Sequence, residues 1–272
     1  MTSSHTPSLR HRSSLVLLFV GLLLGLPATT APAQSVESIV DQMRARYEQQ
    51  MQSVDTYIVE TNLYTSYNKK VMQDGEPTYQ TQTKMTGEGA PSVASTSTPS
   101  AAYGLQFDRL KQHATYAGTE TVNGVRAHVL QVDDPSAVNP DMAQGGAESM
   151  TYYVDAEQYV PTRMVMTTKG GQNNGPQGQS VTVNMTNYQT TDGLTLPHRM
   201  EIEVEINMSD QQRRQMEQAM AQMENLPEQQ RKQMEKMMGD RMEMMKQMMA
   251  GDPVVVEVQR VQVNVALPEG MF

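Results

Sequence analysis

The side chains of this sequence best suited to chemistry are its methionines, which number 24, whereas cysteine is absent. A thioether sulfur is a soft ligand for Cu(I), and a pair such as Met234 and Met237 would place two sulfurs on one helix face. Met245 and Met248 repeat this spacing. Methionine also fills apolar seams between helices and forms adaptable contact surfaces for lipids or proteins. We favour the packed seam, followed by contact with a ligand or partner, with Cu(I) binding a distant third.

Catalytic and metal-binding signatures are otherwise missing. The chain has none of the common zinc-protease, serine-hydrolase, dinucleotide or P-loop motifs, and the glycine-rich segment 170–178 lacks the lysine and following helix of a phosphate cradle. Beyond the N-terminal segment, histidine occurs only as His113, His128 and His198, without a carboxylate at ligand spacing. We interpret His128 as a hydrogen-bonded structural residue of a strand. We therefore predict no enzyme, no catalytic residue, no metal and no cofactor.

The N-terminal segment has the pattern of a cleavable export signal. Arg10 and Arg12 precede an apolar run over 15–26, and the segment ends in Ala31-Pro32-Ala33. The run is shorter than the roughly 20 apolar residues that a membrane-spanning helix needs. We predict cleavage after Ala33, a periplasmic or secreted protein, and no stable membrane insertion after cleavage.

The net charge of the chain limits its partners. The formal charge is −9 at pH 7, and removing the basic signal makes the remainder more acidic. An acidic surface repels nucleic acid, so we expect no nucleic-acid partner. We interpret the charge as a contribution to solubility. The length after residue 33 suits one domain with an elaboration.

The apolar periodicity predicts one helix followed by many strands. Over 35–54 apolar residues recur at steps of three and four, with Ser35 as a cap. The period then becomes two, with polar residues between the apolar ones. Turns are predicted at Asn123-Gly124 and Thr191-Asp192-Gly193. The predicted strands are a long first strand through 57–67 and further strands at 76–86, 116–122, 125–132, 150–154, 160–166, 181–185, 200–206 and 254–265, with loops at 90–102, 134–147 and 170–178.

The predicted last strand changes parity. Its apolar residues occupy even positions up to Val258 and odd positions from Val261. Because successive side chains of a strand alternate between faces, this change requires an extra residue. We predict a β-bulge at Gln259-Arg260, which would bend the sheet.

Residues 209–250 differ from the rest in being dominated by Met, Gln, Glu, Lys and Arg. Ser209 and Gln212 form a plausible capping box, Pro227 restarts the chain, and Gly251 ends the pattern. We predict a methionine-rich helical hairpin, a coiled-coil-like insertion at 208–252 between two strands. The predicted organisation is therefore a signal peptide at 1–33, a β domain at 34–207 and 253–272, and this insertion.

Three phrases of strand and turn resemble the outer-membrane lipoprotein-sorting family. They are residues 118–130, a strand, Asn-Gly turn and strand; 152–163, with a Pro-x-Arg strand start; and 187–199, with a tight turn before a strand. The fold that the resemblance implies is mainly β (α+β), an unclosed antiparallel β-barrel of the LolA/LolB-like kind. We expect the N-terminal helix to lie across its concave face, with the helical hairpin inserted near its end.

The resemblance implies a hydrophobic cavity that shelters acyl chains in transit. We predict a non-covalent carrier or sensor of lipid or lipoprotein acyl chains. The candidate lipid-binding residues are the inward-facing apolar set Val59, Leu63, Met150, Tyr152, Val154, Met164, Met166, Met200, Ile202 and Val204. For each of them, simple core packing is an equal alternative. The alternative function is an envelope interaction protein that docks a partner protein through the hairpin at 209–250.

Overall fold

The computed structural model describes most of the chain beyond the predicted export signal. The described residues are 34–73, 76–86, 92–93, 106–139, 142, 146–169, 178–206, 214, 218 and 251–272. The predicted signal at 1–33 lies outside them, and so does the predicted hairpin at 209–250 apart from residues 214 and 218. Both stay predictions.

The N-terminal helix is present as predicted. Helix α1 spans Val36–Ser53. The side chain of Ser35 accepts a hydrogen bond from Ser38 N (3.2 Å), and Ser38 Oγ accepts one from Ser35 N (3.3 Å), which closes a reciprocal cap. Its buried face consists of Ile39, Val40, Met43, Tyr47, Gln50 and Met51.

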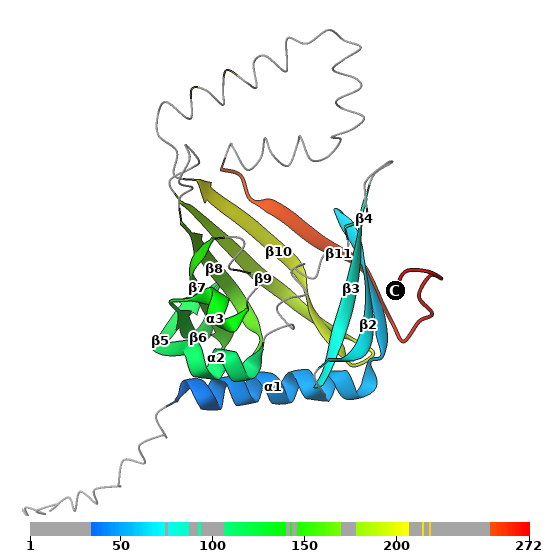
Figure 1. Ribbon diagram of the computed structural model, residues 1–272, viewed down its shortest axis with the longest axis horizontal. Coiled ribbons are helices and arrows are strands. Elements are labelled where there is room, and N and C mark those ends of the chain that lie inside the picture. Colours follow the sequence, from blue (N-terminus) through cyan, green and yellow to red (C-terminus); the bar gives the residue numbers. More distant parts are fainter. Residues whose placement is uncertain are drawn as a thin grey trace, which may run out of the picture. The chain divides into compact units, whose positions relative to one another are not determined.

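All described strands belong to one unclosed antiparallel sheet, which confirms the mainly β, unclosed part of the predicted fold (Figure 1). The strands are β1 Thr56–Thr61, β2 Tyr64–Gln73, β3 Glu76–Met85, β4 Ser92–Val93, β5 Ala114–Val122, β6 Val125–Val132, β7 Ala147–Asp155, β8 Pro161–Thr168, β9 Gln179–Thr191, β10 Leu194–Ile206 and β11 Val254–Val263. Their order is β4-β3-β2-β1-β11-β10-β9-β8-β7-β6-β5. The last strand therefore lies between the first and the tenth, and β4 and β5 form the two edges.

Two glycine turns make the predicted hairpins. Asn123 and Gly124 have φ angles of 53° and 79° between β5 and β6, and Asp192 and Gly193 have 48° and 87° between β9 and β10. Positive φ at both central residues gives a turn whose twist matches that of the flanking strands. Asn, Asp and Gly are the residues that adopt this conformation at least cost.

The predicted long first strand is wrong, because the chain turns back within it. β1 ends at Thr61 and β2 begins at Tyr64. Thr61 Oγ1 accepts hydrogen bonds from Leu63 N (3.1 Å) and Tyr64 N (2.9 Å), so a threonine hydroxyl makes the turn without glycine or proline. The apolar alternation continues across this turn, which hid it in the sequence.

The predicted bulge in the last strand is confirmed. In the pairing of β1 with β11, Glu60 lies opposite Arg260, but Thr61 lies opposite Val258. Gln259 is therefore the extra residue. It lets Val256 and Val261 both face the side of the sheet on which the core packs.

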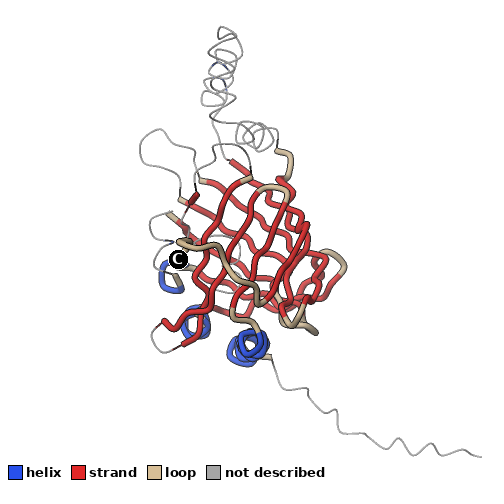
Figure 2. Tube along the Cα trace, turned by 90° about the vertical axis from the view of Figure 1, so that its right-hand side faces the viewer, coloured by secondary structure: helices blue, strands red, loops and turns tan. Residues whose placement is uncertain are grey.

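Two short helices that the sequence analysis did not predict cover part of the sheet. Helix α2 spans Phe107–His113, and helix α3 spans Pro135–Val138 within the segment predicted as a loop. Asp134 caps α3 by accepting a hydrogen bond from Ser136 N (3.1 Å). Together with α1 they gather at one end of the strands, as the view turned by 90° shows (Figure 2).

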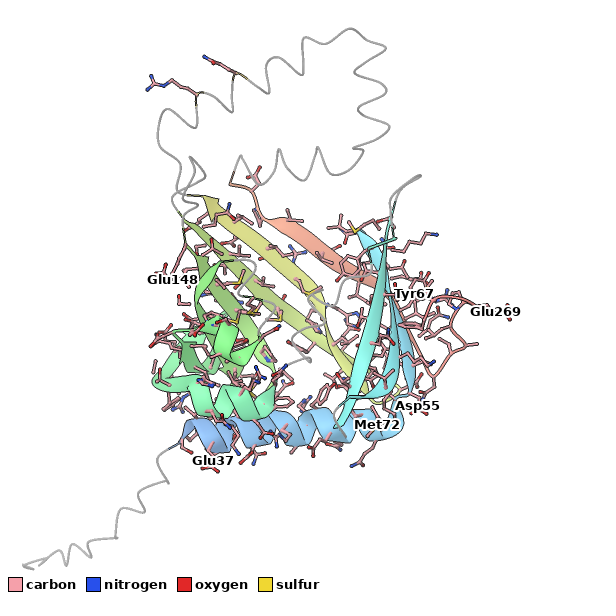
Figure 3. The ribbon with its side chains drawn as sticks, viewed as in Figure 1. Glu37, Asp55, Tyr67, Met72, Glu148 and Glu269 are labelled. Carbon is pink, nitrogen blue, oxygen red and sulfur yellow. The ribbon has the colours of Figure 1, made fainter. Side chains whose placement is uncertain are left out.

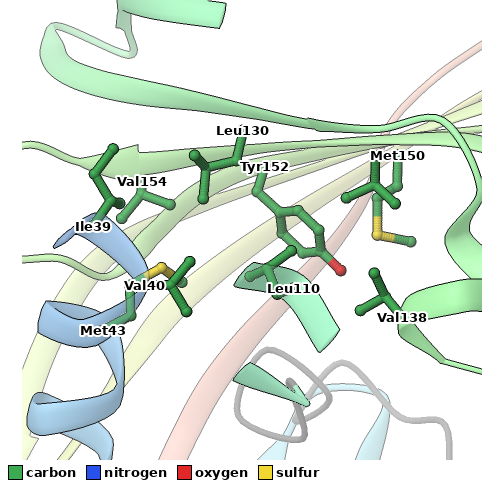
Figure 4. Close-up of a cluster of buried hydrophobic side chains, with 10 residues drawn as sticks. Ile39, Val40, Met43, Leu110, Leu130, Val138, Met150, Tyr152 and Val154 are labelled. Atoms are coloured by element: carbon green, nitrogen blue, oxygen red, sulfur yellow. The ribbon is translucent and has the colours of Figure 1, made fainter. Parts of the chain in front are cut away.

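The largest core cluster joins these helices to strands β6 and β7. It contains Ile39, Val40 and Met43 of α1, Leu110 of α2, Val138 of α3, and Leu130, Val132, Met150, Tyr152 and Val154 of the two strands (Figure 4). We call this set the helix-covered cluster. Because its strand residues pack against α1, the sheet face that carries them is named the inner face.

The C-terminal end of α1 is fixed to the sheet by polar contacts. The last carbonyl groups of a helix lack partners within the helix. Here side chains from elsewhere in the fold donate to them: Lys70 Nζ to Met51 O (3.0 Å), Tyr79 Oη to Val54 O (2.8 Å) and Asn264 Nδ2 to Ser53 O (2.8 Å). Asp55, which lies just beyond the helix and is labelled in Figure 3, also forms an ion pair with Lys70. This end of α1 is therefore a fixed boundary of the inner face.

Candidate functional site

The inner face carries continuous rows of apolar side chains across neighbouring strands. The strand registers define one row that runs from β6 to β11 and a second, parallel to it, from β6 to β10. The first row is Leu130, Tyr152, Met164, Val183, Ile202 and Val254, and the second is Val132, Met150, Met166, Val181 and Val204.

Burial varies along these rows. Leu130 and Tyr152 are buried under α1 and α2, at 0 % and 4 % exposure. On β8, β9 and β10 the rows contain half-buried side chains. We call these the inner apolar strip: Met164, Met166, Val181, Ile202 and Val204. The strip is therefore a continuous part of the inner face, over three neighbouring strands, where apolar side chains keep accessible surface.

The predicted lipid-binding residues divide between this strip and the packed core. Met164, Met166, Ile202 and Val204 belong to the strip, and Leu63 is half-buried in the β1–β2 turn beside it. The others are buried in clusters: Met150, Tyr152 and Val154 in the helix-covered cluster, Val59 with Tyr57 and Leu194, and Met200 with Met185 and Val256.

Strand β9 also contributes to this face, and its residues were not among the predicted lipid-binding set. Val181 belongs to the strip, while Val183 and Met185 are buried beside it at 8 % and 4 % exposure. The alternation of residues 181–185 could have identified them, since it places these three side chains on one face of the strand.

The inner face becomes polar at β2 and β3. Asn68 is fully buried and its Nδ2 donates to Ser66 Oγ (3.2 Å), while Thr81 Oγ1 donates to Asn68 Oδ1 (2.7 Å). Asn68 also lies opposite Tyr57 of β1, which places this network on the inner face. A buried amide with these partners incurs little desolvation cost. The inner face therefore also contains an uncharged polar area on β2 and β3, at the end of the sheet where Tyr57 pairs with Val263.

Two tyrosines on this face stay neutral at physiological pH. Burial raises the pKa of Tyr64, beside Leu63 and the strip, to about 12. Burial also raises the pKa of Tyr152 above its ordinary value. Neither phenol can serve as a base near neutral pH, and the two add no charge to the inner face.

The described histidines lie apart from one another, in different surroundings. His128 is buried, its Nδ1 lies 3.4 Å from Tyr116 Oη, and its ring stacks on that of Tyr159, in agreement with the structural role predicted for it. His113 is exposed at the end of α2. Within the described ranges, no group of three or more His, Asp or Glu side chains is placed to hold a metal ion.

The outer face of the same strands is polar, as predicted for β10. Arg199 donates to Glu201 (2.7 Å) and to Glu257 of β11 (2.6 Å). Glu203 and Glu205 are exposed on this side. The sheet thus has one apolar and one charged face, which is typical of an antiparallel sheet with one side in water. None of the helices in the described part of the chain has the length and apolarity needed to cross a membrane.

Comparison with known proteins gives structural matches only. No protein-family model matches the chain, and no curated protein matches it. Among solved structures, the chain is similar to a DUF1329 family protein from Desulfovibrio piger ATCC 29098 (TM-score 0.43, 11% identity, 87% of this chain and 96% of that chain). It is also similar to a domain assigned as an outer membrane lipoprotein-sorting protein from Vibrio parahaemolyticus (0.42, 12%, 86% and 94%).

A third similar structure is the LolA superfamily protein NE2245 from Nitrosomonas europaea (TM-score 0.38, 11% identity, 88% of this chain and 98% of that chain). The family resemblance noted in the sequence therefore has structural matches, at low sequence identity. All three TM-scores lie below 0.5.

Proposed function

We propose that this protein is a non-covalent carrier or sensor of lipid or lipoprotein acyl chains, acting outside the cytoplasm. The observation that carries the proposal is the inner apolar strip, because apolar side chains there keep accessible surface on the face that elsewhere forms the core. An acyl chain is the ligand whose shape and chemistry match a row of aliphatic and thioether side chains. Burial of a methylene contributes about 0.8 kcal/mol, so a chain of ordinary length can bind reversibly by this effect alone.

The buried members of the predicted set support this surface from below. In our proposal Met150, Tyr152 and Met200 hold the neighbouring strands in place, while the strip and Leu63 contact the ligand. Methionine suits such a surface because its unbranched thioether adapts to chains of different shape. The proposal requires no reacting group and no cofactor.

The test is binding of a neutral apolar probe, N-phenyl-1-naphthylamine, to the purified protein, with displacement by methyl dodecanoate. The double variant Met164→Gln/Ile202→Gln places two amides on the strip, and we expect it to weaken binding about tenfold or more, since each loses apolar contact and gains a polar group to desolvate. Val165→Gln is the matched control. Val165 lies on β8 opposite Thr151 and Thr182, on the outer face, and is also half-buried.

The expected pattern is normal binding by Val165→Gln and weak binding by the double variant, with both variants folded by circular dichroism. Absence of probe binding by the unmodified protein would contradict the proposal. Equal losses in the strip variant and the outer-face control would also contradict it, because the inner face would then have no special part in binding.

A further inference from the structure

His198 is a polar residue on the inner face between apolar neighbours. It lies on β10 between Leu196 and Met200, which are buried at 8 % and 6 % exposure. Alternate residues of a strand share a face, so the imidazole projects to the same side as these two side chains. Leu196 packs in the cluster of Tyr57 and Met200 in that of Val256, so the histidine separates two apolar clusters.

The Nε2 atom of His198 is buried and has no hydrogen-bond partner among the described groups. His128 shares this feature at Nε2, but its ring is held by Tyr116 and Tyr159 inside the fold. His198 instead lies on β10, the strand that also carries Ile202 and Val204 of the strip. A buried polar atom without a partner costs about 1 to 3 kcal/mol. Such a group in a native fold needs a reason.

The apolar side chains around His198 limit which ligand group could pair with its Nε2 atom. By strand position and register, the inner-face side chains beside it on β10 and β11 are Leu196, Met200, Val256 and Val258. None of them could compensate an ionised ligand group, and burial of an unpaired charge is far more costly than burial of a neutral dipole. Burial also lowers the pKa of His198, so the ring is neutral near pH 7. The suitable partner is therefore neutral.

We propose that His198 hydrogen-bonds the carbonyl oxygen of a neutral acyl ester or amide whose hydrocarbon chain lies along the inner apolar strip. This inference rests on the proposed function and adds the class of head group. The ring donates from its Nε2–H tautomer, and the carbonyl accepts. Every acyl ester or amide has this carbonyl at the head of its chain, whereas a free fatty-acid anion would bring an uncompensated charge.

The experiment compares tridecane, methyl dodecanoate and sodium dodecanoate as competitors of N-phenyl-1-naphthylamine at pH 8. We expect the unmodified protein to bind the ester about fivefold to tenfold more tightly than tridecane, which corresponds to the net free energy of one neutral hydrogen bond. His198→Phe should lose this preference and bind tridecane at least as tightly as the ester, because it keeps a ring but offers the buried carbonyl no donor. His198→Gln keeps an amide donor and should retain part of the preference.

The ratio of two affinities in one variant is insensitive to a general loss of structure. Failure of tridecane to bind the unmodified protein would contradict the proposed function itself. Binding of tridecane with an ester preference that survives in His198→Phe would overturn only the role of His198. A preference of the unmodified protein for dodecanoate over the ester would overturn the neutral head group.

Discussion

The turn between β9 and β10 gives the sharpest test of how α1 is held against the sheet. A Cβ atom added at Gly193 would lie 2.8 Å from Ser53 Oγ, near the end of α1, and the φ angle there is 87°. Gly124 has a similar φ of 79°, but nothing lies within 4 Å of its added Cβ. Replacement of either glycine by alanine therefore has the same cost of a positive φ, but only the alanine at position 193 would contact the helix.

The magnitudes follow from this difference. An L-residue in the left-handed region costs about 1 kcal/mol, which we expect for Gly124→Ala. In Gly193→Ala the Ser53 hydroxyl must also turn away and lose its hydrogen bond to Gln50 O (3.4 Å), which adds about 0.5 to 1 kcal/mol. Ser53→Ala removes the close atom and leaves its Cβ at an ordinary 3.7 Å. In that background Gly193→Ala should cost no more than Gly124→Ala.

The assay is urea unfolding of the single variants and of the double variant Ser53→Ala/Gly193→Ala, followed by circular dichroism. The free energies of unfolding form a double-mutant cycle. Equal costs for Gly193→Ala and Gly124→Ala would refute the close approach of the turn to α1. An additive cycle would refute it as well, because the coupling between Ser53 and Gly193 would then be absent.

Three further predictions concern stability. Burial, assisted by Arg126 and opposed by Asp155, lowers the pKa of His128, so the unfolded chain binds protons more readily than the folded protein. The free energy of unfolding should therefore fall as the pH drops below about 6.5. In urea titrations between about pH 7 and 5, His128→Phe should lose less stability than the unmodified protein. Asn264→Ala should destabilise the fold by about 1 to 2 kcal/mol, because Asn264 hydrogen-bonds the end of α1 and has a φ of 54°, which alanine adopts at a cost. In the same assay Asn264→Gly should recover only the cost of the positive φ, since glycine cannot replace the hydrogen bond. Deletion of Gln259 should abolish cooperative unfolding, because it turns one half of β11 to the wrong face.

Features encoded within a short stretch of sequence could be predicted. The turns at Asn123 and Asp192 follow from residues that tolerate positive φ. The bulge at Gln259 follows from parity alone, because a strand with one buried face cannot change parity without an extra residue. The strand β10 is assigned to its two faces correctly for the same reason.

Features without a distinctive local pattern, and features set by contacts distant in sequence, could not be predicted. The turn at Thr61 is made by a single hydroxyl within an uninterrupted apolar alternation. Helix α2 has no side-chain cap, and its one buried residue, Leu110, gives too weak a pattern to predict a helix. The place of β11 between β1 and β10 is set by pairing between the ends of the chain, which periodicity does not record.

The same limit explains why the candidate site was predicted only in part. Alternation assigns a side chain to a face of a strand, but it does not say what lies above that face. Tyr152 and Met164 are neighbours in one row, yet Tyr152 lies under α2 and Met164 is half-buried. The difference depends on which helices lie over each strand, and contacts between residues distant in sequence, such as those of Leu110 in the helix-covered cluster, set it. The accessible part of the candidate site is therefore decided by the tertiary packing of α1, α2 and α3, which alternation does not record.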